Sequence, residues 1–163
     1  MRGLLTTICV LAATAAGAGA ATAATPGSGT YTGLTSQKDA KSGKFQKVEV
    51  KVGSKGKRIK RVRIGFQTTC ADGTGYVSGF FYVPGEEDRA VRKGGKFSFE
   101  TTYKPPDLNP GEKADVFVEG SGRFTSETKV KGSFTVQANI FAGGATTGAL
   151  KCKSGKVTFS AKR

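Results

Sequence analysis

The chain has 163 residues, a formal net charge of +14 at pH 7, and neither histidine nor tryptophan. Without histidine, a Ser-His-Asp triad and a Cys-His pair are impossible, and the commonest metal ligand is missing. The length suits a single domain, and the abundance of Gly, Thr, Val and Phe favours short strands and tight turns over helices.

Residues 1–24 have the order of a secretory signal peptide. Arg2 gives a positive start, an apolar run follows, and two choices of an Ala-x-Ala cleavage site come next, at residues 18–20 and 21–23. The apolar run is too short for a permanent membrane anchor. We therefore expect a single secreted β domain over residues 25–163, and we expect the small residues at 24–28 to be disordered.

Period-two alternation predicts antiparallel strands along the rest of the chain. In residues 44–52, valines occupy one face and charged residues the other, as in a sheet with one solvent-exposed face. Residues 62–70 continue this alternation, but Ile59 is out of phase, so either the strand begins near Arg61 or a bulge lies there. Further strands are predicted at 30–36, 76–83, 97–103, 116–118, 130–140 and 157–161.

A Gly-x-Phe pattern recurs at residues 43–45, 95–97, 122–124 and 132–134. Its spacing is irregular, so it does not indicate a solenoid repeat. We interpret each glycine as the end of a turn or a bulge. Each Phe is then expected to be the first core side chain of its strand.

The densest cluster of charge comprises Lys57, Arg58, Lys60, Arg61 and Arg63. Such runs attract sulfate and phosphate groups, which arginine can bind through two parallel hydrogen bonds. We name these five residues as a candidate binding site for an anionic polymer, with an ordinary solvated hairpin as the alternative. On a regular hairpin, Lys57, Arg61 and Arg63 would share one face. Arg58 and Lys60 would join them only if a bulge realigned the strand.

Cys9 lies in the predicted signal peptide and is lost when the peptide is cleaved, so two cysteines remain, Cys70 and Cys152. An even number of cysteines in an exported chain predicts a disulfide bond, with two free thiols as the alternative. In the chain-entropy account, closing so long a loop contributes about 4 kcal/mol to stability.

Carboxylates are the remaining candidates for catalysis. A glycosidase needs two of them across a cleft, and Asp72, Glu100, Asp115 and Glu119 are available, but no spacing singles out a pair. The adjacent acids at 86–88 lack the alternating ligands of a calcium loop. We expect no metal site, no cofactor and no catalytic residues.

Three short motifs carry a resemblance to a known group. Residues 152–163 read CKSGKVTFSAKR, residues 31–37 carry Tyr-x-Gly-x-Thr-Ser-Gln, and residues 70–73 carry Cys-x-Asp-Gly. The combination resembles small exported β-proteins of high-GC actinobacteria. The resemblance implies an extracellular location and an all-β fold, and it implies no activity. We expect the chain to depart from that group at its proline-rich stretch, 104–113.

Together these patterns predict one all-β domain, an antiparallel sandwich or flattened barrel of about eight to ten short strands with one disulfide. The leading hypothesis is a non-catalytic binding module, secreted or associated with the cell wall, whose cationic surface binds an anionic polymer. A secreted inhibitor or protein-interaction module that uses residues 104–113 is the alternative, and a carboxylate-dependent hydrolase is third. We expect a monomer without a membrane span and without specific nucleic-acid recognition.

Overall fold

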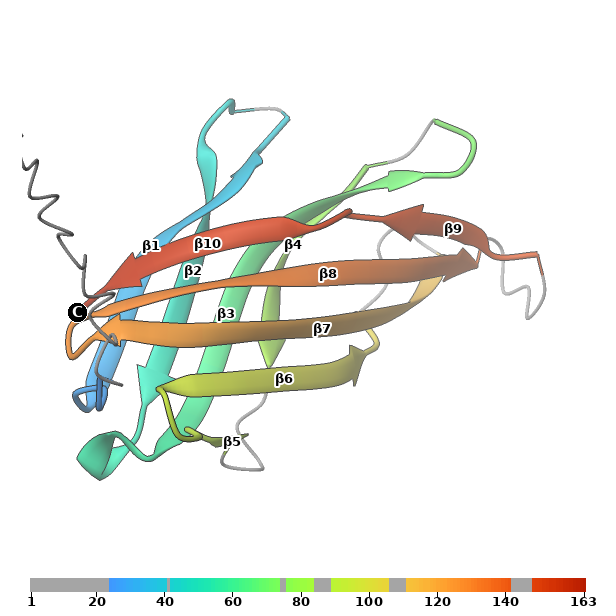
Figure 1. Ribbon diagram of the computed structural model, residues 1–163. Helices are drawn as coiled ribbons and strands as arrows, with labels where there is room; N and C mark the ends of the chain where they lie inside the picture. Colours follow the sequence, from blue (N-terminus) through green and yellow to red (C-terminus); the bar gives the residue numbers. More distant parts are fainter. Residues whose placement is uncertain (1–23, 41, 74–75, 84–88, 106–110, 142–147) are drawn as a thin grey trace, which may run out of the picture.

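The computed structural model describes residues 24–40, 42–73, 76–83, 89–105, 111–141 and 148–163. Within them the secondary structure consists of strands and one short 3-10 turn, η1 (Ser54–Gly56), with no α-helix (Figure 1). The expected signal peptide up to residue 23, the acids at 86–88 and residues 106–110 of the proline-rich stretch lie outside the described residues. The strands are β1 (Gly29–Lys38), β2 (Phe45–Val52), β3 (Arg58–Cys70), β4 (Tyr76–Val83), β5 (Arg89–Ala90), β6 (Lys96–Tyr103), β7 (Lys113–Ser126), β8 (Lys129–Phe141), β9 (Leu150–Lys153) and β10 (Val157–Lys162).

Six of the strands close into a ring in the order β10–β1–β2–β3–β9–β8, because β10 also pairs with β8. Strands β7 and β6 extend the sheet from the other edge of β8, while β4 and β5 pair with β3. Figure 1 shows β6, β7, β8 and β10 as a front layer that crosses β1 to β4 behind it. The predicted all-β antiparallel fold is confirmed, and it takes the form of a six-stranded barrel with extra strands.

The predicted disulfide bond is confirmed between Cys70 and Cys152. These residues lie directly opposite each other where β3 meets β9. That ladder contains one further residue pair, Thr69 opposite Lys153, and is the shortest of the ring. The covalent bond therefore reinforces the seam that has the fewest backbone hydrogen bonds.

The expected alternation places the core between the two layers. Val48, Val50 and Val52 are at most 3% exposed, and the inward residues of β3 from Val62 to Cys70 are buried in the same way. Of the two alternatives for Ile59, the bulge is correct. The partner of Lys51 is Arg61, but the partner of Val52 is Ile59, so β3 has one extra residue there and Ile59 is buried.

The Gly-x-Phe expectation holds in full only at residues 95–97, where Gly95 ends the turn before β6 and Phe97 is the first buried side chain of that strand. Gly122 and Gly132 lie inside β7 and β8, after buried residues of the same strands, so the phenylalanines that follow them are core residues but not the first of their strands. Phe97, Phe124 and Phe134 are buried, whereas Phe45 is 46% exposed. The prediction is wrong at Phe45 because this residue pairs with Lys38 near the end of the β1–β2 hairpin. Figure 1 shows that end of the hairpin extending past β10, so no opposite layer covers it.

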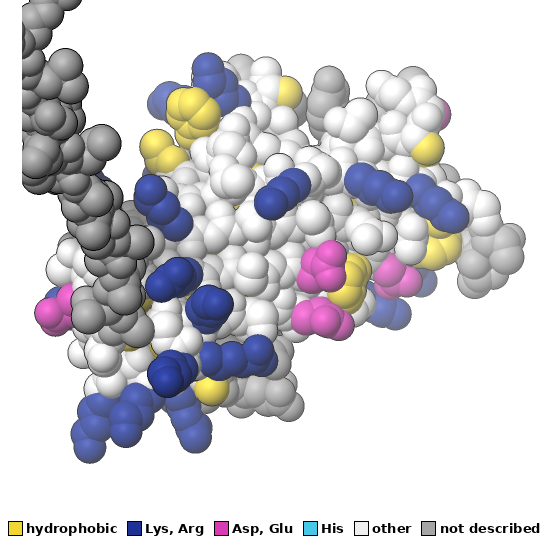
Figure 2. Space-filling view, in the orientation of Figure 1, with side chains coloured by type: hydrophobic (Ala, Val, Ile, Leu, Met, Phe, Trp, Pro, Cys, Tyr) yellow, Lys and Arg dark blue, Asp and Glu magenta, His cyan; other side chains and the backbone are white. Residues whose placement is uncertain are grey.

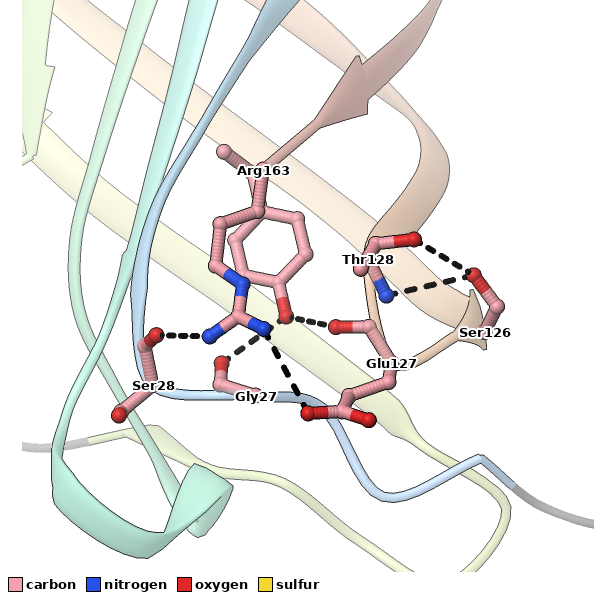
Figure 3. Close-up of polar contacts among 7 residues, drawn as sticks. Gly27, Ser28, Ser126, Glu127, Thr128 and Arg163 are labelled. Atoms are coloured by element: carbon pink, nitrogen blue, oxygen red, sulfur yellow. Dashed lines mark hydrogen bonds and ion pairs between the residues drawn. The ribbon is translucent and has the colours of Figure 1, made fainter.

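The expectation of disorder at residues 24–28 is wrong, because this stretch packs against the turn between β7 and β8. Pro26 is buried, and the backbone N–H of Gly27 donates to the carbonyl of Glu127 at 3.1 Å. The Tyr31 hydroxyl lies 2.9 Å from the Gly27 carbonyl and 2.5 Å from the Glu127 carbonyl (Figure 3). Local composition does not predict these contacts, because the partners are far apart in the sequence.

The last residue, Arg163, is held at the same turn (Figure 3). Its guanidinium donates to the Ser28 carbonyl at 2.6 Å and lies 3.4 Å from the Glu127 carboxylate, while its backbone N–H donates to the Thr128 carbonyl at 3.0 Å. Burial raises the pKa of the Tyr31 hydroxyl above its ordinary value of 10.0, and the positive charge of Arg163 opposes part of that rise. Both ends of the described chain thus share one anchor.

Candidate anion-binding face

Four cationic side chains form one row across the outer face of the front layer. Arg92 lies opposite Lys96 across a tight turn, Lys96 lies opposite Arg123, and Arg123 lies opposite Lys131. All four are exposed. Because neighbouring strands are about 4.8 Å apart, each charge is separated from the next by a single strand spacing. We call Arg92, Lys96, Arg123 and Lys131 the cationic row.

The Gly-x-Phe pattern creates the centre of this row. Phe97 and Phe124 point into the core, so the residues before them, Lys96 and Arg123, point outward. The ladder then aligns the two copies, with Phe97 opposite Gly122 and Lys96 opposite Arg123. The Phe97 ring lies so close to Gly122 that a side chain there would collide with it. Close packing beneath the row therefore fixes the backbone that carries the charges.

Among the residues that the structure describes, no acidic side chain is paired with the charges of the row. The Arg123 Nε donates to the Gly94 carbonyl, at 3.2 Å. Like charges directly opposite each other in a sheet repel and destabilise it. A bound anion would remove that repulsion, so the site has an electrostatic reason to take one.

A row of hydroxyl groups runs beside the cationic row, two residues further along each strand. Ser98 lies opposite Ser121, Ser121 opposite Ser133, and Ser133 opposite Thr158. The three serines and the cationic row line an open hollow of about 430 Å³. Serine hydroxyls can donate to the oxygens of phosphate, sulfate or a sugar. The face thus offers charge and neutral hydrogen bonds to the same ligand.

The distribution of charge is visible on the surface. Figure 2 shows several Lys and Arg side chains gathered at the lower left of the front face, where Figure 1 places the start of β6 and, below it, the turn between β2 and β3 that contains η1. An acidic spot lies nearer the middle of the same face. Further Lys and Arg side chains are spread over the rest of this face, so the lower left is the densest part of a wider positive surface.

The outer face of β6 and β7 carries a carboxylate pair that the sequence did not single out. Glu100 lies directly opposite Glu119, and Thr135 Oγ1 donates to Glu119 Oε1 at 3.1 Å. The pair lines a second open hollow, of about 570 Å³. Both carboxylates are exposed on an open sheet, whereas a carboxyl that serves as a general acid needs a desolvated pocket.

The other two carboxylates named as candidates lie elsewhere. Asp115 is 3.6 Å from the Lys104 ammonium, and Asp72 belongs to the turn after β3. The ladder does not bring either of them opposite another of the named acids. The structure therefore assembles one pair from the four acids, Glu100 with Glu119.

The basic run predicted from the sequence lies at the start of β3. Lys57, Arg58, Lys60 and Arg63 are exposed, and Arg61 is half-buried. Because of the bulge, Ile59 and Val62 are both buried although they are three residues apart, so the exposed Arg58 and Lys60 come into phase with Arg61 and Arg63. The realignment that would bring the basic residues outward together is therefore present.

An acidic residue lies within that basic run. Arg61 Nε and Nη2 donate to the same carboxylate oxygen of Glu49, at 3.0 and 2.5 Å. Glu49 also lies directly opposite Arg63 in the β2–β3 ladder. The local excess of positive charge is thus smaller than the sequence run suggests. The run adjoins the cationic row at one end, because the Lys57 carbonyl accepts a hydrogen bond from the backbone N–H of Val91, the residue before Arg92.

The described residues contain no group of three or more His, Cys, Asp or Glu side chains placed to hold a metal ion. Among the same residues, no helix has the length and apolar character needed to cross a bilayer. Comparisons of the chain with protein-family models, with curated proteins and with solved structures find no match.

Proposed function

We propose that this protein is a non-catalytic binding module, secreted or associated with the cell wall, that holds an anionic polymer on the cationic row. The observation that carries the proposal is the register that sets four exposed cations opposite one another without an ion pair among the described residues. Guanidinium and ammonium groups are the side chains that bind phosphate and sulfate.

The shape of the site favours an extended ligand over a single small anion. The charges are spread over four chain segments along an open face, and no walls enclose them. A linear polyanion lying across the strands would place successive anionic groups over successive cations. The net charge of +14 would also draw such a polymer from a distance.

Export is part of the same proposal. The disulfide bond between Cys70 and Cys152 is of the kind that forms and persists in oxidising compartments. Anionic polymers of the cell wall or the extracellular medium would be available there. The basic run of β3 is the second candidate for the contact surface of this function.

Three variants with matched charge test where the polymer binds. Each variant loses three cations, so net charge cannot explain a difference between them. The row triple is Lys96→Ser, Arg123→Ser and Lys131→Ser; the hairpin triple is Arg58→Ser, Lys60→Ser and Arg61→Ser; the control triple is Lys129→Ser, Lys151→Ser and Lys153→Ser.

The measurement is the salt concentration that elutes each variant from a polyphosphate matrix. We expect the row triple to elute at the lowest salt, and its slope of log K against log[salt] to fall by roughly 2 to 3, because about one counterion is released per phosphate contact. A larger shift for the hairpin triple would place the contact on β3. Equal shifts for all three triples would mean that the attraction is diffuse and that no site exists.

The alternative function, an inhibitor or protein-interaction module, makes a different prediction for salt. A shaped protein interface keeps most of its affinity when ionic strength rises, whereas polymer binding through exposed charges is screened. Retention of a protein partner at high salt, together with no retention on polyphosphate at low salt, would favour the alternative.

A further inference from the structure

We infer that the outer end of the β1–β2 hairpin is a second binding site, one that takes the surface of a bilayer with anionic headgroups. The inference does not depend on the polymer site, although Leu34 and Lys131 of the cationic row line one open hollow. The inference begins with Leu34 and Phe45, which are 50% and 46% exposed. They are the large hydrophobic side chains that the described part of the chain leaves most open to water.

The two apolar residues lie on one hairpin. Leu34 of β1 lies opposite Lys47 of β2, and Phe45 is two residues before Lys47 on the same strand face. The ladder is irregular between these pairs, and Phe45 lies opposite Lys38. Leu34 and Phe45 thus occupy exposed positions on either side of one register shift. Phe45 lies on the projecting part of the hairpin, and Leu34 lies where β1 still pairs with β10, opposite Ser160. Single exposed apolar residues are common on protein surfaces, but two of them on one hairpin form a patch.

Lysines surround this apolar pair. Lys38, Lys44 and Lys47 are all exposed, and Lys38 Nζ lies 5.1 Å from the centre of the Phe45 ring. Figure 2 shows hydrophobic side chains among Lys and Arg side chains at the upper left, where Figure 1 places the end of this hairpin. The combination is an apolar patch within a positive ring.

The nearby acid, Asp39, serves the turn. Its carboxylate accepts hydrogen bonds from the Ser42 backbone N–H at 2.7 Å and from Gln46 Nε2 at 3.3 Å. The backbone N–H of Asp39 also donates to the Lys44 carbonyl at 2.7 Å. These bonds hold the hairpin end in one shape, so the apolar pair is presented in a fixed position.

A bilayer surface satisfies both halves of this patch. Its headgroup region accepts an aromatic ring and a leucine side chain at the boundary with the acyl chains, while anionic headgroups attract the lysines. A soluble polyanion would pair with the lysines, but it offers no apolar phase for Leu34 and Phe45. The adjacent charges and the two exposed apolar residues therefore favour a membrane surface as the occupant.

The absence of tryptophan from the chain permits a direct test. Phe45→Trp gives a protein whose only indole is at the hairpin end, and Phe117→Trp, in a half-buried position on the outer face of β7, is the matched control. Each protein is mixed with vesicles of phosphatidylglycerol or of phosphatidylcholine. We expect the Phe45→Trp emission to shift to shorter wavelength, and to be quenched by brominated lipid, with the anionic vesicles alone.

Further variants separate this site from the polymer site. Changing Lys38, Lys44 and Lys47 to Ser in the Phe45→Trp background should weaken vesicle binding roughly tenfold to a hundredfold. The row triple should leave the emission shift unchanged, and Phe45→Ser should leave elution from polyphosphate unchanged. The inference is overturned if the Phe45→Trp emission does not respond to anionic vesicles, or if Phe117→Trp responds equally. A response abolished by the row triple would also overturn it, because the contact would then belong to the other face.

Discussion

Lys96 of β6 lies directly opposite Arg123 of β7, and both side chains are exposed on the outer face of the sheet. Arg92 and Lys131 continue the same line on either side. In the free protein this arrangement is unfavourable, since like charges face one another across the strands. The consequence is that the unliganded fold should become more stable when one of these charges is removed.

Replacing Lys131 with Thr should therefore raise the free energy of unfolding at low ionic strength by about 0.2 to 1 kcal/mol. The gain should shrink as salt screens the repulsion. Denaturant titration at two salt concentrations measures it. Lys151→Thr on β9 is the control, because Lys151 lies opposite the uncharged Asn139 and the substitution has the same effect on strand propensity. An equal change in the free energy of unfolding of both variants would show that repulsion within the cationic row is not the cause.

Tyr31→Phe should lower the free energy of unfolding by about 0.5 to 1.5 kcal/mol, because the hydroxyl near the Gly27 and Glu127 carbonyls is lost. Burial raises the pKa of this hydroxyl, so unfolded chains ionise first as the pH rises above the ordinary value of 10.0. The contribution of Tyr31 is thus complete below pH 10 and is lost as the pH rises through the pKa of the folded state. Unfolding curves of both proteins, recorded from about pH 8 to about pH 12, should converge at the alkaline end. A constant gap would contradict this account.

Replacing Cys70 and Cys152 with Ala should lower the free energy of unfolding by about 4 kcal/mol, since the bond closes a loop with a sequence separation of 82. The loss of protection against hydrogen exchange should be greatest near the short β3–β9 ladder. Hydrogen exchange of the β9 amides, compared with those of the long β7–β8 ladder, measures this. Uniform loss of protection in both ladders at matched stability would mean that the bond does not protect this seam in particular.

Arg61→Ser should destabilise the protein by about 0.5 to 1 kcal/mol, because it removes the partner of the half-buried Glu49 carboxylate. Lys60→Ser, at the neighbouring exposed position, is the comparison and should cost less. Thermal unfolding of both variants gives the difference. Equal stability of the two variants would show that the Arg61–Glu49 pair contributes nothing measurable.

The sequence predicted what local alternation and chemistry determine. The inward valines of β2, the inward residues of β3 and the disulfide bond were all expected from spacing or from residue type, and all are present. The bulge near Ile59 was one of two open alternatives, because the phase break was visible but its cause was not. These features depend on residues close together in the chain, or on a single possible pairing of cysteines.

The candidate site could not be predicted in the same way, because it depends on register between distant strands. Nothing in the order of the chain places Lys96 opposite Arg123 or Glu100 opposite Glu119. The first pair is separated by 27 positions in the sequence and the second by 19. The one available signal was the repeated Gly-x-Phe pattern, whose middle residue must point away from the core. Phe45 shows the limit of that pattern, since the same three residues at a projecting hairpin leave the ring exposed.

The most direct test of the cationic row is the response of its backbone amides to a polyanion. Labelled protein is titrated with polyphosphate at low salt, and the chemical-shift changes are mapped along the chain. The account predicts the largest changes at Lys96, Arg123 and Lys131 and at the adjoining Ser121, all reversed by added salt. Changes concentrated in residues 57–63, with the row unaffected, would contradict it.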